Sequence, residues 1–169
     1  AVEYLREKGL AASEKKAGRI ASEGVCLSYL SDDKKIGVVV EVNSETDFVA
    51  KNPVFREYVL QVAEHIAYSQ AKDVETLLTE PWKFDTSLTV AEALSSKVAV
   101  IGENLKIRRF EKYVKDNAGM IVSYVHGGGR IGVMIDIDCE NPTEAVEEMG
   151  KNIAMQIAAL NPKFIAVEN

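Results

Sequence analysis

The sequence predicts an α+β fold with two related subdomains, each an antiparallel sheet flanked by helices. Three observations lead to this prediction. A two-strand pattern occurs twice, at an offset of 95 residues from Gly24 to Gly119. A helix start signal and an apolar helical stripe follow each occurrence, and one further strand pattern lies between the two. The chain is therefore an internal duplication, and we name its halves the first copy and the second copy.

The repeated pattern is a hairpin of two strands. Residues 24–30 align with 119–125, and residues 36–42 with 131–137, without a gap. These segments are rich in β-branched and other apolar residues, which is typical of strands. The connecting loops are equal in length and contain Asp or Gly, which tolerate tight turns. We expect strands at 25–30 and 36–42 in the first copy, and a hairpin over 120–137 in the second.

A helix is expected after each hairpin. It begins at an Asn-Pro pair, Asn52-Pro53 or Asn141-Pro142, in which Asn suits the N-cap and Pro the first helical position. Apolar residues then recur on one helical face, so we expect helices from 53 onward and over 142–160. Their apolar stripes comprise Phe55, Val59, Val62 and Ile66 in the first copy, and Val146, Met149, Ile153, Ile157 and Leu160 in the second.

The first copy is longer than the second just before its helix. The Asn-Pro pairs are offset by 89 residues, whereas the apolar stripes, with Val62 on Ile153, are offset by 91. Compared with the hairpin offset of 95, the first copy therefore carries six or four additional residues. Either alignment places the surplus in the segment that contains residues 46–49. A repeated scaffold with an added segment indicates that the addition serves function rather than folding.

Between the copies we expect a short helix after Asp73, a loop over 81–87 and a longer helix. A capping box from Thr89 to Glu92 opens the longer helix, which runs to about Ile101 and is ended by Gly102. Residues 105–112 follow as a strand. His65 lies outside the apolar stripe of its helix, and we expect it at the surface.

These elements divide the chain into three parts. Residues 1–23 are predicted to be the remnant of an N-terminal helical domain and a linker, 24–116 the first core subdomain, and 117–169 the second. The symmetry of the duplication calls for a third strand in the second copy, yet no such pattern occurs before Asn169. We therefore expect an incomplete second subdomain with a less protected sheet edge, in a fragment or a naturally short chain with a trimmed N-terminus.

Composition narrows the functional classes. The net charge of −6 and the pI of about 5.1 argue against nucleic acid as the main partner, because phosphate binding needs a basic surface. Cys26 and Cys139 make no disulfide framework and are interpreted as reduced thiols in a cytosol-like compartment. No apolar run approaches the roughly 20 residues of a membrane helix, and no signal or transit peptide is recognisable.

Residues 43–53 are the most informative segment. They follow a strongly apolar strand pattern and precede a helix start, so Phe48, between Asp47 and Val49, is expected in a loop. Loops on rigid scaffolds are where binding residues concentrate. A Phe beside an Asp suits action on another protein, since the ring can fill a pocket while the carboxylate competes for a donor or for a metal shell.

The same segment resembles a known family. Residues 41–43, followed by Thr46-Asp47-Phe48-Val49-Ala50-Lys51-Asn52, are similar to the signature of elongation factor Ts, the guanine-nucleotide exchange factors that act on elongation factor Tu. Residues 1–10 with 15–19, residues 97–109 and residues 124–133 resemble further family motifs. The similarity covers essentially the whole chain, in the family's order.

The resemblance implies both a fold and a function. The strand at 105–112 would join the first hairpin in a three-stranded antiparallel sheet. The protein would bind elongation factor Tu, GDP-bound and nucleotide-free, and promote nucleotide exchange in translation elongation. It would be no enzyme and would need no cofactor or metal of its own, no direct nucleic-acid binding and no membrane. A bacterial cytoplasm is the implied location, with an organellar matrix or stroma as the alternative, and self-association in the complex stays open.

The resemblance also implies residue roles. Phe48 would wedge between helices of the partner's nucleotide domain, and Asp47 would disturb its magnesium site. Thr46 and Val49 would shape the segment, and Val49 would in addition pack against the partner. Further partner contacts would come from Ile101, Gly102 and His126.

Several alternatives stand beside these roles. Phe48 could fold back onto its own core. Glu41, Glu45 and Asp47 could serve a metal-dependent small hydrolase, although their spacing matches no calcium loop and no His or Cys lies nearby. A scaffold that holds a translation factor without exchanging its nucleotide is the other rival.

The remaining candidates have plain structural interpretations. Ile101 and Gly102 fit an ordinary helix end, and His126 fits a solvated hairpin loop. The glycine-rich loop 126–130 joins strand to strand, whereas a phosphate cradle leads into a helix.

Overall fold

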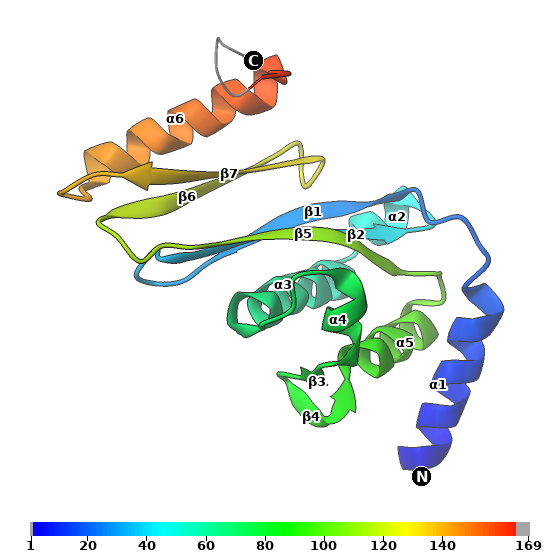
Figure 1. Ribbon diagram of the computed structural model, residues 1–169. Helices are drawn as coiled ribbons and strands as arrows, with labels where there is room; N and C mark the ends of the chain where they lie inside the picture. Colours follow the sequence, from blue (N-terminus) through cyan, green and yellow to red (C-terminus); the bar gives the residue numbers. More distant parts are fainter. Residues whose placement is uncertain (1, 165–169) are drawn as a thin grey trace.

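Two antiparallel sheets lie face to face at the centre of the molecule, and helices cover the outer face of each (Figure 1). The computed structural model describes residues 2–164, with side chains from residue 9 onward. Strands β1 (Glu23–Leu30), β2 (Ile36–Ser44) and β5 (Lys106–Val114) form the first sheet in the order β1-β2-β5. Both pairings are antiparallel, which confirms the expected three-stranded sheet. The second sheet consists of β6 (Gly119–His126) and β7 (Ile131–Asp138) within the described residues. The α+β class is therefore confirmed.

The two hairpins are related by an approximate two-fold axis. The backbone N–H of Cys26 donates to the carbonyl of Gly129 at 2.7 Å, and the N–H of Ile121 donates to the carbonyl of Lys34 at 2.8 Å. Replacing each residue of one bond by its equivalent in the other copy, 95 positions away, gives the other bond. The hydroxyls of the equivalent residues Ser28 and Ser123 meet at 3.1 Å. Residue i thus contacts j while the equivalent of i contacts the equivalent of j, as in an isologous dimer interface.

One helix of each copy lies against the outer face of its sheet. These are α3 (Pro53–Tyr68) in the first copy and α6 (Glu144–Leu160) in the second. Asn52 caps α3 as predicted, with its side chain accepting from the N–H of Val54 at 2.8 Å. The expected start of α6 was wrong: Thr143 is the N-cap, and Asn141-Pro142 precede the helix. Thr143, two residues after the Asn, takes the cap by accepting from the N–H of Val146. The face of α6 on β6 and β7 carries the buried Gly150 and Ala154, whereas Met149, Ile153 and Leu160 of the predicted apolar stripe are exposed. The N-caps are then offset by 91 residues, which fixes the surplus of the first copy at four.

The segment between the copies covers α3 from its far side. It contains α4 (Val74–Thr79), β3 (Pro81–Trp82), β4 (Asp85–Thr89) and α5 (Val90–Ile101). The short helix after Asp73, the capping box of Thr89 and Glu92, and the helix end at Gly102 are confirmed, and Asp73 is the N-cap of the short helix.

Two expectations for this region were wrong. The predicted loop at 81–87 contains the β3–β4 hairpin, and His65 is buried rather than at the surface. Trp82 of β3 stacks on the His65 ring with centroids 5.1 Å apart. The β3–β4 hairpin therefore covers a side of α3 that lies outside its apolar stripe.

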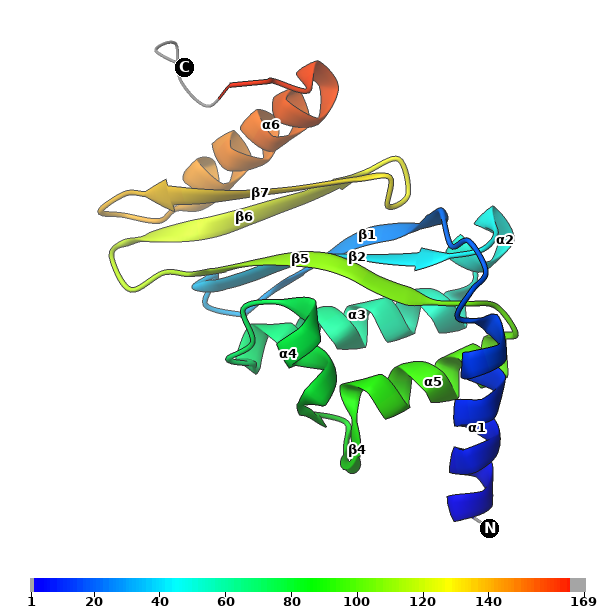
Figure 2. The ribbon, with the colours of Figure 1, turned by 45° about the vertical axis from the view of Figure 1, so that its right-hand side comes forward.

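Helix α1 (Val2–Lys16) packs against α5 at the edge of the molecule (Figure 2). Residues 17–22 connect it to β1, and the division of the chain at residues 23 and 116 stays a prediction. Cys26 and Cys139 are both free. Among the helices that the structure describes, none has the length and apolarity to cross a membrane.

Candidate functional site

The added segment of the first copy forms a short helical turn, α2 (Asp47–Ala50), where the sequence predicted a loop. The Thr46 hydroxyl caps it by accepting from the N–H of Val49 at 3.4 Å. The methyl group of Ala50 is buried, and Val49 packs partly against the core below the turn. These local contacts explain why the segment is helical: one side chain caps the turn and another is anchored in the core.

Phe48 is the most exposed aromatic side chain of the described residues, at 81%. The neighbouring Ala50 takes the inward position, and the ring therefore points away from the protein. The alternative in which Phe48 folds back onto its own core does not hold. An exposed aromatic ring on an anchored turn is the type of side chain that supplies an interface hot spot.

Asp47 lies beside the ring as an exposed carboxylate. Its Oδ2 accepts from Lys51 Nζ at 2.7 Å, an i,i+4 pair. The hydrogen bond and the charge of Lys51 lower the pKa of Asp47, so the carboxylate is ionised at neutral pH. Exposed pairs of this type are weak. Asp47 can therefore leave Lys51 for a stronger donor on another molecule.

The end of α5 lies next to α2. Ile101 is half-buried, and Gly102 is exposed and in the left-handed conformation of a C-cap. The next residue, Glu103, accepts hydrogen bonds from Thr46. Two of the predicted partner-contact positions, Ile101 and Gly102, are thus held beside the segment that carries Phe48.

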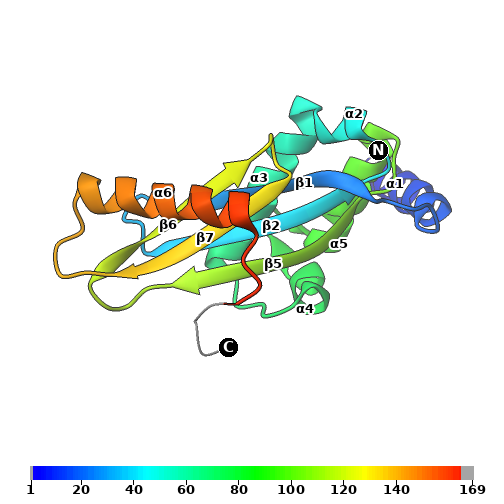
Figure 3. The ribbon, with the colours of Figure 1, turned by 90° about the horizontal axis from the view of Figure 1, so that it is seen from above.

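His126 ends β6 and is exposed, with Nδ1 2.9 Å from the hydroxyl of Tyr124. Its loop is fastened to α3 by Arg56, whose Nη1 donates to the carbonyl of Gly128 at 2.7 Å. Because α3 directly follows α2, the β6–β7 loop and α2 lie at the same end of the molecule (Figure 3). No helix follows this loop, which agrees with the interpretation that it is no phosphate cradle.

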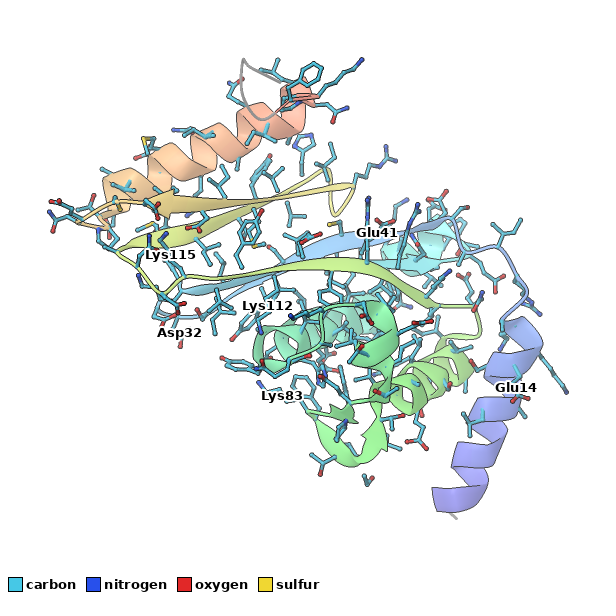
Figure 4. All side chains as sticks on the ribbon, in the orientation of Figure 1. Glu14, Asp32, Glu41, Lys83, Lys112 and Lys115 are labelled. Carbon is cyan, nitrogen blue, oxygen red and sulfur yellow. The ribbon has the colours of Figure 1, made fainter. Side chains whose placement is uncertain are left out.

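The three carboxylates of the hydrolase alternative do not converge. Glu41 lines a cavity of about 560 Å³ between the sheets and pairs with Arg109 at 2.7 Å (Figure 4). Glu45 accepts from the backbone N–H of Asn104 at 2.6 Å, and Asp47 pairs with Lys51. Each acid has a separate partner, and in the described part of the chain no group of three His, Cys, Asp or Glu could hold a metal ion. The geometry gives the hydrolase no support.

Sequence reasoning missed one residue of this region, Glu103, which connects the end of α5 to α2. A signal was present, since an acid directly after a helix-ending Gly has no role in the helix itself. Its partner could not be read from local pattern, because Thr46 lies 57 residues away.

Comparison with known proteins identifies the family. Residues 45–169 match the family model described as elongation factor TS. The chain is 53% identical over 165 residues to elongation factor Ts of Clostridium novyi (strain NT), which covers 98% of this chain and 54% of the relative. It is 50% identical over 166 residues to elongation factor Ts of Halothermothrix orenii, with the same two coverages of 98% and 54%. The chain thus spans about half the length of the curated relatives that it matches.

Proposed function

The chain belongs to the elongation factor Ts family, and on that premise we propose that it binds elongation factor Tu and promotes the release of its GDP during translation elongation. The observation that carries the proposal is Phe48, exposed at 81% on a capped and anchored turn that the second copy lacks. The resemblance and this geometry agree on the same residue.

The mechanism is conformational and forms no covalent bond. Phe48 enters between helices of the partner's nucleotide domain, and the ionised Asp47 exchanges Lys51 for donors of the network that holds magnesium there. The weakened metal and phosphate contacts then release GDP. Thr46 and Val49 hold the turn, and contacts at Ile101, Gly102 and His126 hold the partner.

The burial of the Phe48 ring does not by itself supply the free energy that faster GDP release requires. Burying a Phe side chain gains about 1.5–3 kcal/mol. A thousandfold acceleration of GDP release requires about 4 kcal/mol of differential stabilisation, at about 1.4 kcal/mol for each factor of ten. The ring alone is insufficient, and Asp47 with the flanking contacts has to supply the rest.

Thermodynamic linkage adds a requirement. If the chain weakens GDP binding by some factor, GDP weakens the binding of the chain to elongation factor Tu by the same factor. Added nucleotide therefore releases the chain from its partner. The proposed setting is the cytoplasm of a bacterium, with elongation factor Tu, in its GDP-bound and nucleotide-free forms, as the partner.

Stopped-flow release of fluorescent GDP from elongation factor Tu tests the function. We expect the wild-type chain to accelerate release, and Phe48→Ala to reduce the acceleration by about ten- to hundredfold, the equivalent of the lost ring burial. The matched control is Phe84→Ala, which removes another exposed aromatic from the turn between β3 and β4 and should leave release unchanged.

Three other results would contradict the proposal. Binding of elongation factor Tu without faster GDP release would make the chain a scaffold. Metal-dependent hydrolysis of a phosphoester by the isolated chain would support the hydrolase alternative instead. Equal activity of Phe48→Ala and wild type would show that insertion of the Phe48 ring does not drive GDP release.

A further inference from the structure

Glu103 makes three hydrogen bonds to the start of the α2 turn. Its Oε2 accepts from the backbone N–H groups of Glu45 and Thr46, each at 3.0 Å. Its Oε1 accepts from the Thr46 hydroxyl at 2.6 Å. One partly buried carboxylate therefore satisfies both backbone donors that precede α2 and the side chain that caps it. Hydrogen bonds to an ionised acceptor are stronger than neutral ones.

Three further contacts join the same segments through Glu45, Asn104 and Arg19. The carboxylate of Glu45 accepts from the backbone N–H of Asn104 at 2.6 Å. The Asn104 side chain donates to the carbonyl of Arg19 at 2.7 Å, and the Arg19 guanidinium lies 3.6 Å from Glu45. The start of α2, the end of α5 and the linker after α1 are joined at one point.

The turn needs such support. A helical segment of four residues is far below the length at which isolated helices are stable in water. Its own anchors are the cap at Thr46 and the buried Ala50, and both leave Phe48 on the exposed side. An unsupported turn would have to be ordered on binding, and that ordering reduces affinity.

We propose that Glu103 is a positioning residue that fixes the direction in which α2 presents Asp47 and Phe48. The proposal rests on the proposed function, because it concerns how the exchange segment is presented. Glu103 acts through Thr46 and does not touch the partner. It also makes α2 and the α5 end, with Ile101 and Gly102, one rigid surface that meets the partner without rearrangement.

Gln is the informative substitution at this position. Glu103 uses two oxygens to accept from three donors, whereas Gln offers one oxygen and an NH₂ group that cannot accept. Glu103→Gln keeps the size of the side chain but removes its charge. Its single oxygen then makes only weaker, neutral hydrogen bonds to the N–H groups of Glu45 and Thr46, and its NH₂ can meet the Thr46 hydroxyl only as a donor. Glu140→Gln is the matched control, because Glu140 is exposed on the segment between β7 and α6.

The first experiment needs no partner and follows the backbone amides by NMR hydrogen exchange. In folded Glu103→Gln, we expect the amides of Glu45 and Thr46 to exchange about tenfold faster than in wild type, and those of the sheet core to keep their rates. Fluorescence of the buried Trp82 reports that the fold is intact. Unchanged exchange at residues 45 and 46 would overturn the proposal.

The second experiment is a double-mutant cycle in the GDP-release assay. If Glu103 acts through the α2 turn, Glu103→Gln lowers the maximal acceleration in the wild-type background but causes a smaller loss when Asp47 and Phe48 are both replaced by Ala. Additive losses would mean that Glu103 acts by another route and would overturn the positioning role.

The two experiments separate the two proposals. If wild type fails to accelerate GDP release, the proposed function is wrong, and the amide exchange rates alone then decide whether Glu103 orders the turn. If wild type is active and the cycle is additive, the function stands and the role of Glu103 is wrong.

Discussion

The helices α3 and α6 occupy equivalent positions on equivalent hairpins, yet their surroundings differ. At the offset of 91 residues, Ala63 corresponds to Ala154, and both are fully buried against their sheets. Val62 corresponds to Ile153, and here the first side chain is fully buried while the second is 43% exposed. The difference arises because α5 and the β3–β4 hairpin cover the outer side of α3, whereas the described residues place no element over α6 (Figure 1).

This comparison separates scaffold from function. Both copies share the antiparallel strand pair, the approximate two-fold contact between the hairpins, and a helix packed on the sheet. The four added residues in the first copy produce α2 and expose Phe48. The two copies thus share one scaffold, and the candidate site lies in the copy that carries the additional segment.

The test with the largest expected effect concerns Gly24 and Gly119, which lie at the start of β1 and β6 with φ of 136° and 127°. A Cβ at these positions would lie 2.2 Å from the carbonyl oxygen of Val42 and 1.9 Å from that of Ile137. We expect Gly24→Ala and Gly119→Ala to lower the free energy of unfolding by at least about 3 kcal/mol each. Urea denaturation measures both. A large cost in one copy with none in the other would show that the two scaffolds are not equivalent.

The second test sharpens the contrast between the helices. Val62→Ala removes fully buried methyl groups and should destabilise by about 2 kcal/mol, whereas Ile153→Ala should cost less than about 1 kcal/mol because its side chain is already partly in water. Urea denaturation followed by the fluorescence of Trp82, the one tryptophan of the sequence, gives both values. Equal costs would mean that the outer face of α6 is covered in solution, for example by self-association, which a dilution series would reveal.

The smallest effect concerns pH. The N–H of Lys83 donates to Nδ1 of His65 at 3.2 Å, so Nε2 carries the proton and donates to Glu80 at 3.1 Å. Burial lowers the pKa of His65 below its ordinary 6.5, although the Glu80 bond opposes this shift. The unfolded chain then binds the proton more readily. His65 therefore contributes its full stability above about pH 6.5, and this contribution is lost as the pH falls below that value.

We expect the free energy of unfolding to decline from pH 7 to 5 by no more than about 1.4 kcal/mol per pH unit, the limit for one proton. His65→Asn should remove this slope, and His126→Asn, at an exposed histidine, should keep it. The equivalent of His65 in the second copy is the exposed Gln156, so the slope belongs to the first copy alone. Denaturation at several pH values checks this, and a slope that survives in His65→Asn would assign it to another group.

Much of the fold was predictable because its signals are local. The hairpins follow from β-branched residues and turn residues, α3 and α5 from caps at Asn52 and Thr89, and the end of α5 from Gly102. The start of α6 was predicted two residues early, because Asn141 and Thr143 are both acceptable caps and only packing on the second sheet distinguishes them. For the candidate site, the segment and its two central residues were predicted, but not its helical form.

What the sequence by itself determined is the duplicated scaffold, the position of the added segment and the family, since periodicity, spacing and motif are properties of neighbouring residues. The tertiary structure decided the rest. It buried His65 under Trp82, separated Glu41, Glu45 and Asp47 onto different partners, and brought Glu103 to Thr46. Each of these outcomes depends on contacts between residues far apart in the chain, where packing and hydrogen-bond satisfaction act without leaving a local pattern.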